Sequence, residues 1–273
     1  MKRFFERPPP GVDAAELSGL HIVIEGPDAS GRSTHIALLT EWLEQRGYPV
    51  ATTELSSSRL VEEELEAAKQ GNLLSPRTMS LFYATDFYDQ LENIVIPALR
   101  AGSIVLSDRY LYTLMARDLV RGGDMDWLRS LYSMAVVPDQ VYYFSVDRAT
   151  LIERTFAYPA RLNYWQSGMD MGLSRDWYDS LVLYQKRMRT AFRRLDEEYG
   201  FETVDANRRL ATIQQDLRDR IDGIVEERYS PAADRAPLLR LRSTSGQTPT
   251  RGPKAPVLPI HRARRGELPE TSR

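Results

Sequence analysis

Residues 26–34, Gly26-Pro27-Asp28-Ala29-Ser30-Gly31-Arg32-Ser33-Thr34, have the spacing of a phosphate-binding loop, G-x-x-x-x-G-K-[ST], with arginine at the lysine position. A β-branched run at 20–25 precedes them and predicts a strand, and Ile36, Leu39 and Leu43 follow at helical spacing. A strand, a glycine loop and a helix bring main-chain N–H groups and the positive end of a helix dipole to one point. We therefore predict phosphate binding, the alternative being a simple glycine turn.

The side chains of this loop suggest how a nucleotide is held. The predicted ligands of the donor phosphates are Gly26, Ser30, Gly31, Arg32, Ser33 and Thr34. Arg32 replaces the compact charge of lysine by a larger planar fork that also recognises phosphate, so binding is expected while the rate of phosphoryl transfer stays open. Ser33 supplies the hydroxyl expected to bind Mg²⁺.

Composition limits the class of protein. A chain of 273 residues, 42% of them hydrophobic, suffices for one α/β domain with a sizeable core. The formal net charge of −2 gives no reason to expect a nucleic-acid partner. The lack of cysteine excludes disulfides and thiolate catalysis, and the three histidines have no metal-ligand spacing. No apolar run would span a membrane and no signal peptide is evident, so we expect a cytoplasmic location.

Strand and helix patterns alternate between Leu20 and Tyr229. We predict strands at 20–25, 49–53, 103–107, 140–146 and 201–205, and helices at 33–46, 58–70, 76–100, 110–121, 124–135, 148–156, 177–199 and 207–228. This order predicts an α/β fold in which helices cover both faces of a parallel sheet.

The two ends of the chain differ in composition from its centre. Residues 1–18 contain Pro8-Pro9-Pro10-Gly11 and are predicted to be a flexible leader outside the core. Residues 230–273 are rich in Pro, Arg, Ser and Thr and are predicted to be a disordered tail. The positive charge of this tail suits an acidic partner, and a solvated tail is the alternative.

A second part of a phosphoryl-transfer site follows the third predicted strand. The apolar run at 104–106 leads through Ser107 into Asp108 and Arg109. Ligands of open α/β sheets bind at the carboxyl ends of strands. Asp108 is placed there to help hold Mg²⁺, and Arg109 to hold the phosphate of an acceptor. The alternative is an ordinary ion pair at a strand end.

Two more carboxylates and one segment are candidates. Asp28 within the loop and Glu54 at the end of the second strand are placed to reach an acceptor. The alternatives are that Asp28 only forms a turn and that Glu54 is a solvated residue at a strand end. Residues 155–176 contain few regular signals and include Arg161 and Arg175. Such a segment can act as a lid that excludes water and neutralises charge, with Arg161 as the candidate catalytic arginine. A solvated arginine is the alternative.

With these pieces in this order, the chain resembles the thymidylate kinases, a group of P-loop nucleoside monophosphate kinases, over residues 20–228. The resemblance rests on these stretches: Ile22-Val23-Ile24-Glu25-Gly26, Gly31-Arg32-Ser33-Thr34, Tyr83-Ala84-Thr85-Asp86, Ile96-Pro97-Ala98-Leu99, Ser107-Asp108-Arg109-Tyr110, Pro138-Asp139 and Val204-Asp205-Ala206-Asn207. It implies a P-loop kinase domain at 19–229, with a five-stranded parallel sheet and an arginine-bearing lid at 155–176. It also implies transfer of the γ-phosphate of ATP to dTMP with Mg²⁺, and a homodimer.

The resemblance assigns roles to residues of the donor half. Arg32 takes the position of the P-loop lysine, and Ser33 and Asp108 lie near the metal ion. Asp205 is implied to lie near the adenine of the donor.

In the acceptor half, the resemblance places Asp28 near the sugar, Arg109 on the phosphate, and Tyr83 where a phenylalanine usually stacks on thymine.

Three departures concern the acceptor. An arginine that the family carries after its Ala-Asp pair is Phe87 here, and a Thr-Arg-Glu-Pro segment reads Thr-Thr-Glu-Leu at 52–55. A Tyr-Gln pair is Arg117-Asp118, and Arg117 would restore charge near the acceptor.

Three functions follow from these patterns. The first is a nucleoside monophosphate kinase that converts dTMP to dTDP. The second is a non-catalytic, nucleotide-binding regulator on the same fold, suggested by Arg32 and the missing arginines. The third is a related phosphotransferase with another donor or acceptor, such as polyphosphate or a nucleoside.

Overall fold

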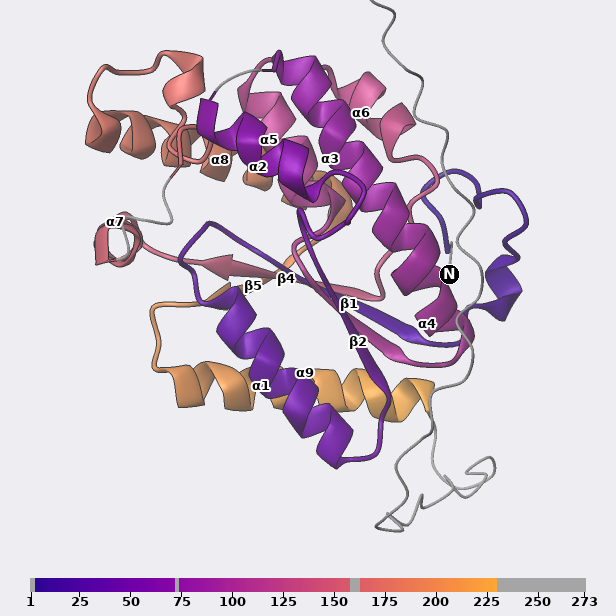
Figure 1. Cartoon of the computed structure of the whole chain (residues 1–273). Helices are drawn as coiled ribbons and strands as arrows, with labels where there is room; N and C mark the ends of the chain where they lie inside the picture. Colours follow the sequence, from indigo (N-terminus) through magenta and orange to yellow (C-terminus); the bar gives the residue numbers. More distant parts are fainter. Residues whose placement is uncertain (1–2, 72–73, 158–162, 230–273) are drawn as a thin grey trace, which may run out of the picture. The chain divides into compact units, whose positions relative to one another are not determined.

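The computed structural model describes residues 3–71, 74–157 and 163–229. Its centre is a sheet of five parallel strands in the order β2-β3-β1-β4-β5 (Figure 1). The strands are β1 (Leu20–Glu25), β2 (Val50–Glu54), β3 (Ile104–Asp108), β4 (Gln140–Ser145) and β5 (Glu202–Asp205). Each end lies within one residue of its predicted position, and the predicted α/β fold with a five-stranded parallel sheet is confirmed.

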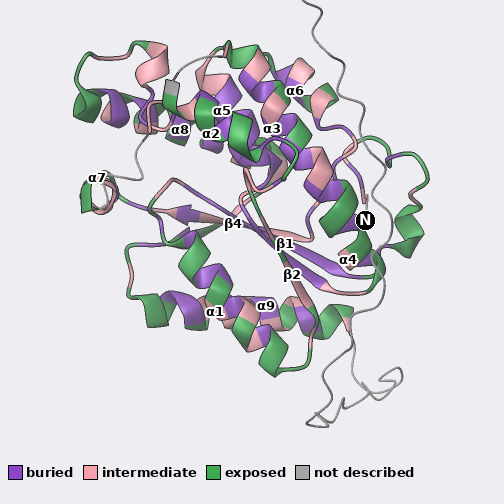
Figure 2. Cartoon of the chain, viewed as in Figure 1, coloured by how far each residue is buried: buried purple, intermediate pink, exposed green. Residues whose placement is uncertain are grey.

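Helices α1 (Arg32–Gln45) and α9 (Leu210–Arg228) cover one face of the sheet (Figure 1). Successive residues of a strand point to opposite faces, and Ile22 and Ile24 of β1 pack into the core beneath these two helices. All six residues of β1 are buried because the sheet is covered on both sides, whereas the edge strand β2 is more exposed (Figure 2).

The opposite face carries the larger helical layer. It contains α2 (Glu62–Gly71), α3 (Pro76–Gln90), α4 (Ile96–Arg100), α5 (Leu111–Val120), α6 (Met125–Leu131) and α8 (Trp177–Tyr199). Helix α7 (Arg148–Ala157) follows β4, and short 3₁₀ turns occur at Ala14–Glu16 and Met169–Met171. The helix predicted at 76–100 is divided by a π-helical turn at Leu91–Val95. This turn precedes Pro97, which has no N–H to donate to the preceding turn.

The N-terminal segment is part of the domain, so the structure differs from the predicted leader at 1–18. Phe4 and Leu17 are each only 4% exposed and belong to the core on the α5 face. The Arg3 guanidinium donates to both carboxylate oxygens of Asp139 at 2.9 Å, and the Arg228 guanidinium binds the same carboxylate. The proline run suggested a segment outside the core, although the two apolar residues that flank it, Phe4 and Leu17, are buried. The predicted tail at 230–273 lies outside the described residues.

The strand order brings two loops together. β1 leads through α1 to β2 on one side, whereas its neighbour β3 leads through α5 and α6 to β4 on the other. Adjacent strands whose connections leave in opposite directions open a crevice at their carboxyl ends. The loop at 26–31 and the pair Asp108–Arg109 meet at this point. Within the described residues, no helix is long and apolar enough to cross a bilayer.

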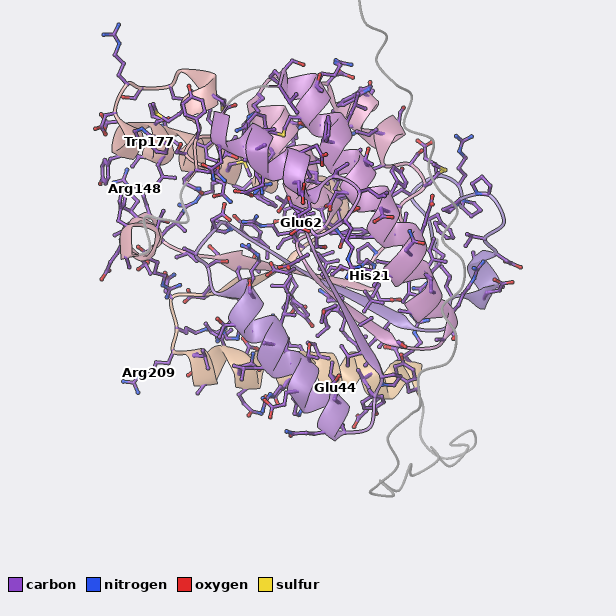
Figure 3. The ribbon with its side chains drawn as sticks, viewed as in Figure 1. His21, Glu44, Glu62, Arg148, Trp177 and Arg209 are labelled. Carbon is purple, nitrogen blue, oxygen red and sulfur yellow. The ribbon has the colours of Figure 1, made fainter. Side chains whose placement is uncertain are left out.

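A buried histidine lies in the centre of the sheet. His21 is fully buried in β1 between the two helical layers (Figure 3), and its Nε2 lies 2.9 Å from Ser107 Oγ on β3. Ser107 Oγ lies in turn 2.8 Å from Thr53 Oγ1 on β2. Burial lowers the pKa of His21 to about 3, so the ring is neutral in the folded protein at all moderate pH values.

The His21→Gln variant tests this burial. Unfolded His21 has a pKa of about 6.5, so unfolding takes up a proton as the pH falls below that value, and folded stability is lost. We expect His21 to account for a loss of about 2 kcal/mol between pH 7 and pH 5. Urea denaturation at both pH values should show a correspondingly smaller loss in His21→Gln than in the wild type. Equal losses in the two proteins would contradict the prediction.

Candidate active site

The loop between β1 and α1 turns through positive φ angles at Gly26 (145°), Ala29 (60°) and Gly31 (91°). A side chain at residue 26 would place its Cβ only 2.9 Å from the carbonyl oxygen of Phe144, so glycine is required there. Helix α1 starts directly after Gly31, and its first N–H groups, which have no partner within the helix, border the loop.

A cavity of about 390 Å³ lies against this helix start. Its lining comprises Asp28, Ala29, Ser30, Gly31, Arg32, Ser33, Thr34, Arg154, Thr155, Gln166, Leu181 and Gln185. Nearly the whole predicted phosphate loop therefore borders one space, together with residues that flank or belong to the predicted lid. Arg154 contacts the carbonyl of Ala206 only at 3.4 Å, a long hydrogen bond.

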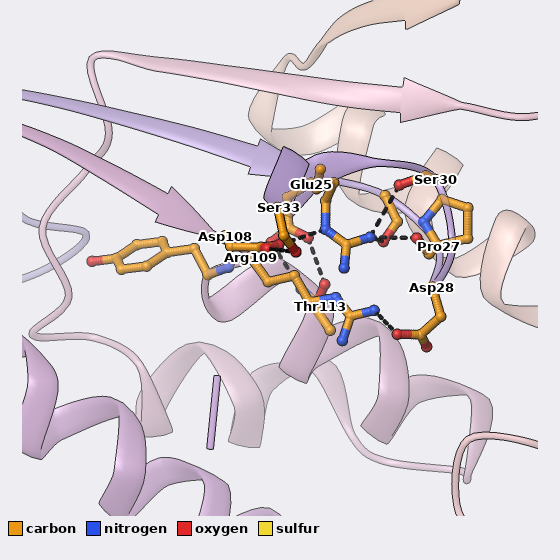
Figure 4. Close-up of polar contacts among 11 residues, drawn as sticks. Glu25, Pro27, Asp28, Ser30, Ser33, Asp108, Arg109 and Thr113 are labelled. Atoms are coloured by element: carbon orange, nitrogen blue, oxygen red, sulfur yellow. Dashed lines mark hydrogen bonds and ion pairs between the residues drawn. The ribbon is translucent and has the colours of Figure 1, made fainter. Parts of the chain in front are cut away.

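The Arg32 side chain turns back into the loop, toward Pro27 and Ser30, which are labelled in Figure 4. Its Nε donates to Asp108 Oδ1 at 2.7 Å, and its Nη1 donates to the carbonyl of Gly26 at 2.7 Å. The same Nη1 also donates to the carbonyl of Pro27. With a side chain only 8% exposed, Arg32 ties the loop to the end of β3. A lysine has no such fork and would not make these contacts simultaneously.

Asp108 and Ser33 offer oxygen ligands at the same place. Asp108 Oδ2 accepts a hydrogen bond from Ser33 Oγ at 2.5 Å. Burial alone would raise the pKa of Asp108, but the guanidiniums of Arg32 and then Arg109 outweigh it and lower the pKa. The carboxylate is therefore ionised at neutral pH. A carboxylate and a hydroxyl fit Mg²⁺, which binds one or two protein oxygens and completes its shell with phosphates and water.

Arg109 and Asp28 form the next ion pair. Arg109 Nη2 binds Asp28 Oδ1, and the main-chain N–H of Arg109 donates to the carbonyl of Ile24 at 3.0 Å. Burial opposes ionisation of Asp28, but Arg109 and then Arg117 hold its pKa well below the usual value. Arg109 has a φ of 72°, and the described chain contains just three non-glycine residues with positive φ. Two of them, Ala29 and Arg109, lie here, as strained residues often do at functional sites.

A second cavity, of about 230 Å³, begins at this ion pair. Its lining includes Asp28, Arg109, Thr113, Arg117, Tyr184 and Gln185. The two cavities share Asp28 and Gln185. The loop therefore separates two spaces that meet at Asp28, one over the helix start and one beside Arg109.

Comparison with known proteins decides the family. The family profile described as thymidylate kinase matches residues 24–163, just over half of the chain. The chain belongs to the thymidylate kinase family. It is 36% identical to probable thymidylate kinase 2 of Saccharolobus solfataricus, over 74% of this chain and 95% of that protein. It is also 30% identical to a thymidylate kinase of Clavibacter michiganensis and 29% identical to a probable one of Thermococcus gammatolerans, in each case over 77% of this chain and 97% of the relative. The predicted resemblance is confirmed.

The other predicted acceptor residues of this thymidylate kinase family member lie at different depths. Glu54 is exposed at the end of β2 and borders a small hollow together with Arg109. Tyr83 on α3 is 3% exposed and borders neither of the two cavities. Of the replaced pair, Arg117 borders the second cavity, whereas Asp118 accepts a hydrogen bond from Ser80 Oγ at 2.5 Å. The substrate roles of Glu54, Tyr83 and Arg117 stay predictions.

Of the remaining predicted residues of the donor side and the lid, only Thr34 is seen to join the phosphate loop in the described part of the chain. Asp205 is exposed at the end of β5 and accepts a hydrogen bond from the main-chain N–H of Asn207 at 3.0 Å, and it borders neither cavity. Thr34 is exposed and borders the first cavity. Arg161 lies outside the described residues, and Arg175 is exposed without bordering either cavity.

Glu25 is a site residue that sequence reasoning missed. Its Oε1 accepts hydrogen bonds from the N–H groups of Tyr110 at 2.9 Å and Thr113 at 3.1 Å, and its Oε2 from Thr113 Oγ1 at 2.5 Å. Glu25 at the end of β1 thus caps the start of α5, whose own N-cap residue makes no side-chain hydrogen bond. Burial raises the pKa of Glu25, although these hydrogen bonds oppose the rise. The signal in the sequence was an acidic residue at the end of a mostly apolar predicted strand.

A buried ion pair fastens part of the lid segment to α5. Arg121 Nε donates to Asp170 Oδ2 at 2.7 Å, and Arg121 Nη2 donates to Asp170 Oδ1 at 3.0 Å. The Arg121 guanidinium also lies 3.5 Å from the ring centroid of Trp165 and donates to the Trp165 carbonyl at 2.9 Å. Both charged side chains are at most 4% exposed. The described part of the segment, from residue 163, is therefore anchored rather than free.

The Glu25→Ala variant tests the cap. Two main-chain N–H groups and the Thr113 hydroxyl would lose their shared acceptor, and we expect a loss of about 2–3 kcal/mol in the free energy of unfolding. Urea denaturation measures it. The matched control is Glu44→Ala, an exposed glutamate on α1, for which we expect a change within about 0.5 kcal/mol. Similar values for the two variants would argue against the cap.

The Asp170→Ala variant tests the anchor. It leaves the Arg121 guanidinium buried and unpaired, which we expect to cost about 3–5 kcal/mol in chemical denaturation. Asp126→Ala is the matched control, because Asp126 pairs with an arginine on the surface and should cost at most about 1 kcal/mol. A small effect of Asp170→Ala, with rapid proteolysis at residues 163–176 already in the wild type, would show that the segment is not anchored.

Proposed function

We propose that this member of the thymidylate kinase family transfers the γ-phosphate of ATP to dTMP, giving dTDP and ADP, with Mg²⁺ as the metal. The observation that carries the proposal is the pair of cavities that meet at Asp28, with the phosphate loop in one and Arg109 in the other. Phosphoryl transfer between two nucleotides needs two adjacent sites whose phosphates can approach in line.

The first cavity is proposed for the donor. The N–H groups at the start of α1 would bind the donor phosphates, and Arg32 would supply the positive charge that lysine supplies in other P-loops. Ser33 and Asp108 would hold Mg²⁺, which neutralises phosphate charge when it is bound. Asp205 is proposed to lie near the adenine, and Arg161 to act from the lid.

The second cavity is proposed for the acceptor. Arg109 would bind its phosphate, and Asp28 would lie near its sugar. Both side chains are held in place before any ligand arrives, because each is the other's ion-pair partner and Arg109 is fixed by its unusual φ. Such pre-positioning supplies much of the rate enhancement in phosphoryl transfer, where the protein forms no covalent intermediate. A homodimer, a cytoplasmic location and an acidic partner of the tail stay predictions.

A coupled assay of ADP release across common nucleoside monophosphates tests the function. We expect dTMP to give the highest kcat/KM. The Asp108→Asn variant should lose roughly 100-fold or more in kcat, because it removes a charge that holds the metal and Arg32. Arg32→Lys keeps the cation but loses the fork that binds Asp108 and the loop carbonyls together, so it should retain part of the activity, whereas Arg32→Ala should lose most of it.

Other outcomes separate the alternatives. ATP binding by calorimetry without turnover on any monophosphate would contradict the kinase. Activity that arises only in Arg32→Lys would indicate a nucleotide-binding regulator instead. Turnover with thymidine or polyphosphate in place of dTMP or ATP would indicate a related phosphotransferase. Circular dichroism of each variant verifies that the fold is intact.

A further inference from the structure

Arg117 on α5 is a buried cation without a partner. The residue is 5% exposed, and its guanidinium makes no hydrogen bond or ion pair with any residue in the described ranges. Apart from the hydrogen bonds of the helix itself, the described residues give Arg117 one polar contact, at its main-chain carbonyl, which accepts from Arg121 Nη1 at 3.1 Å. An unpaired buried charge is costly, and proteins rarely keep one unless a ligand completes it.

The Arg117 side chain rests on an aromatic ring. Its Cζ lies 5.4 Å from the centroid of the Tyr83 ring on α3, a cation–π distance. Tyr83 is itself 3% exposed, and its hydroxyl is buried without a hydrogen-bond partner among the described residues. The Tyr83 ring therefore supports the Arg117 guanidinium from α3.

The charges of the second cavity favour an anion. Arg109, which precedes α5, and Arg117, in the second turn of α5, line this cavity together with Asp28, which leaves one excess positive charge at this end. On α8, Arg189, Arg193 and Asp196 line the same cavity and leave a second excess positive charge. Arg109 already has Asp28 as its partner, whereas Arg117 has none. A dianionic phosphate monoester next to Arg109 would provide the missing partner.

We propose that Arg117 is the second arm of a clamp for the acceptor phosphate, and that Tyr83 positions Arg117 instead of stacking on the acceptor base. The proposal rests on the proposed function and assigns which group of the acceptor Arg117 recognises. It also accounts for departures in the sequence: arginines expected near the acceptor phosphate on α3 and β2 are absent, and Arg117 enters the second cavity from α5.

Calorimetry with dTMP and thymidine separates recognition of phosphate from recognition of base and sugar. In Arg117→Gln we expect the Kd for dTMP to rise roughly 30-fold or more, and the Kd for thymidine to change by no more than about twofold. Arg117→Lys should retain more dTMP affinity than Arg117→Gln because it keeps the charge. Arg187→Gln is the matched control, since Arg187 is exposed on α8 and borders neither nucleotide cavity. ATP affinity should be unchanged in all three.

Tyr83 variants test the positioning role. Tyr83→Leu removes the ring and should weaken the binding of dTMP but not that of thymidine. Tyr83→Phe keeps the ring and should weaken dTMP binding much less. If Tyr83→Leu weakened thymidine binding as much as dTMP binding, the result would show that Tyr83 contacts the base, and the positioning role would be overturned.

The proposal that Arg117 binds the acceptor phosphate can be overturned while the proposed kinase function stands. Equal losses of dTMP and thymidine affinity in Arg117→Gln, or no loss of either, would overturn the clamp while dTMP turnover still supports the function. If wild-type protein binds ATP but not dTMP, the proposed acceptor is wrong. The same comparison then uses the monophosphate that does bind and its nucleoside. A protein that binds no monophosphate would overturn both proposals.

Discussion

The ion pair between Arg32 and Asp108 is the constraint on which the site depends. It joins the first residue of α1 to the last residue of β3, two elements that are neighbours only because of the strand order. Arg32 also binds the carbonyls of the loop, so one guanidinium fixes the loop, the helix start and the strand end together. In a phosphate-binding loop, the lysine at this position reaches the phosphates of the nucleotide. Here the residue at that position also has a structural role, because its guanidinium fork reaches the Asp108 carboxylate and two loop carbonyls at once.

Each aspartate of the site lies among arginines. Arg32 and Arg109 lower the pKa of Asp108 and keep it ionised. Arg109 and Arg117 have the same effect on Asp28. Glu25 lies next to both pairs but is used differently, as an acceptor for the N–H groups of α5. This helix carries Thr113 and Arg117 into the second cavity, so the cap on α5 also orients the acceptor side. Stability and substrate binding therefore share the same few residues.

Much of the fold could be predicted from sequence because its signals are local. The strands are β-branched and apolar, and the loop motif fixes the first connection. Contacts between distant segments could not be predicted. Glu25 carries no motif of its own, since its role depends on where α5 begins. The pairing of Arg121 with Asp170 joins residues 49 positions apart, and composition alone does not pair one arginine among many with one acid. Phe4 escaped notice because prolines dominate its neighbourhood.

The carboxylate of Asp139 binds Arg3 from the beginning of the domain and Arg228 from its last helix. The two ends of the folded unit are thus neighbours in space, as is common in compact domains. A short linker between them would allow new termini to be opened elsewhere, for example at the exposed Gly122 between α5 and α6, without separating any strand from its partner. Circular permutation of this enzyme is therefore compatible with an unchanged nucleotide site.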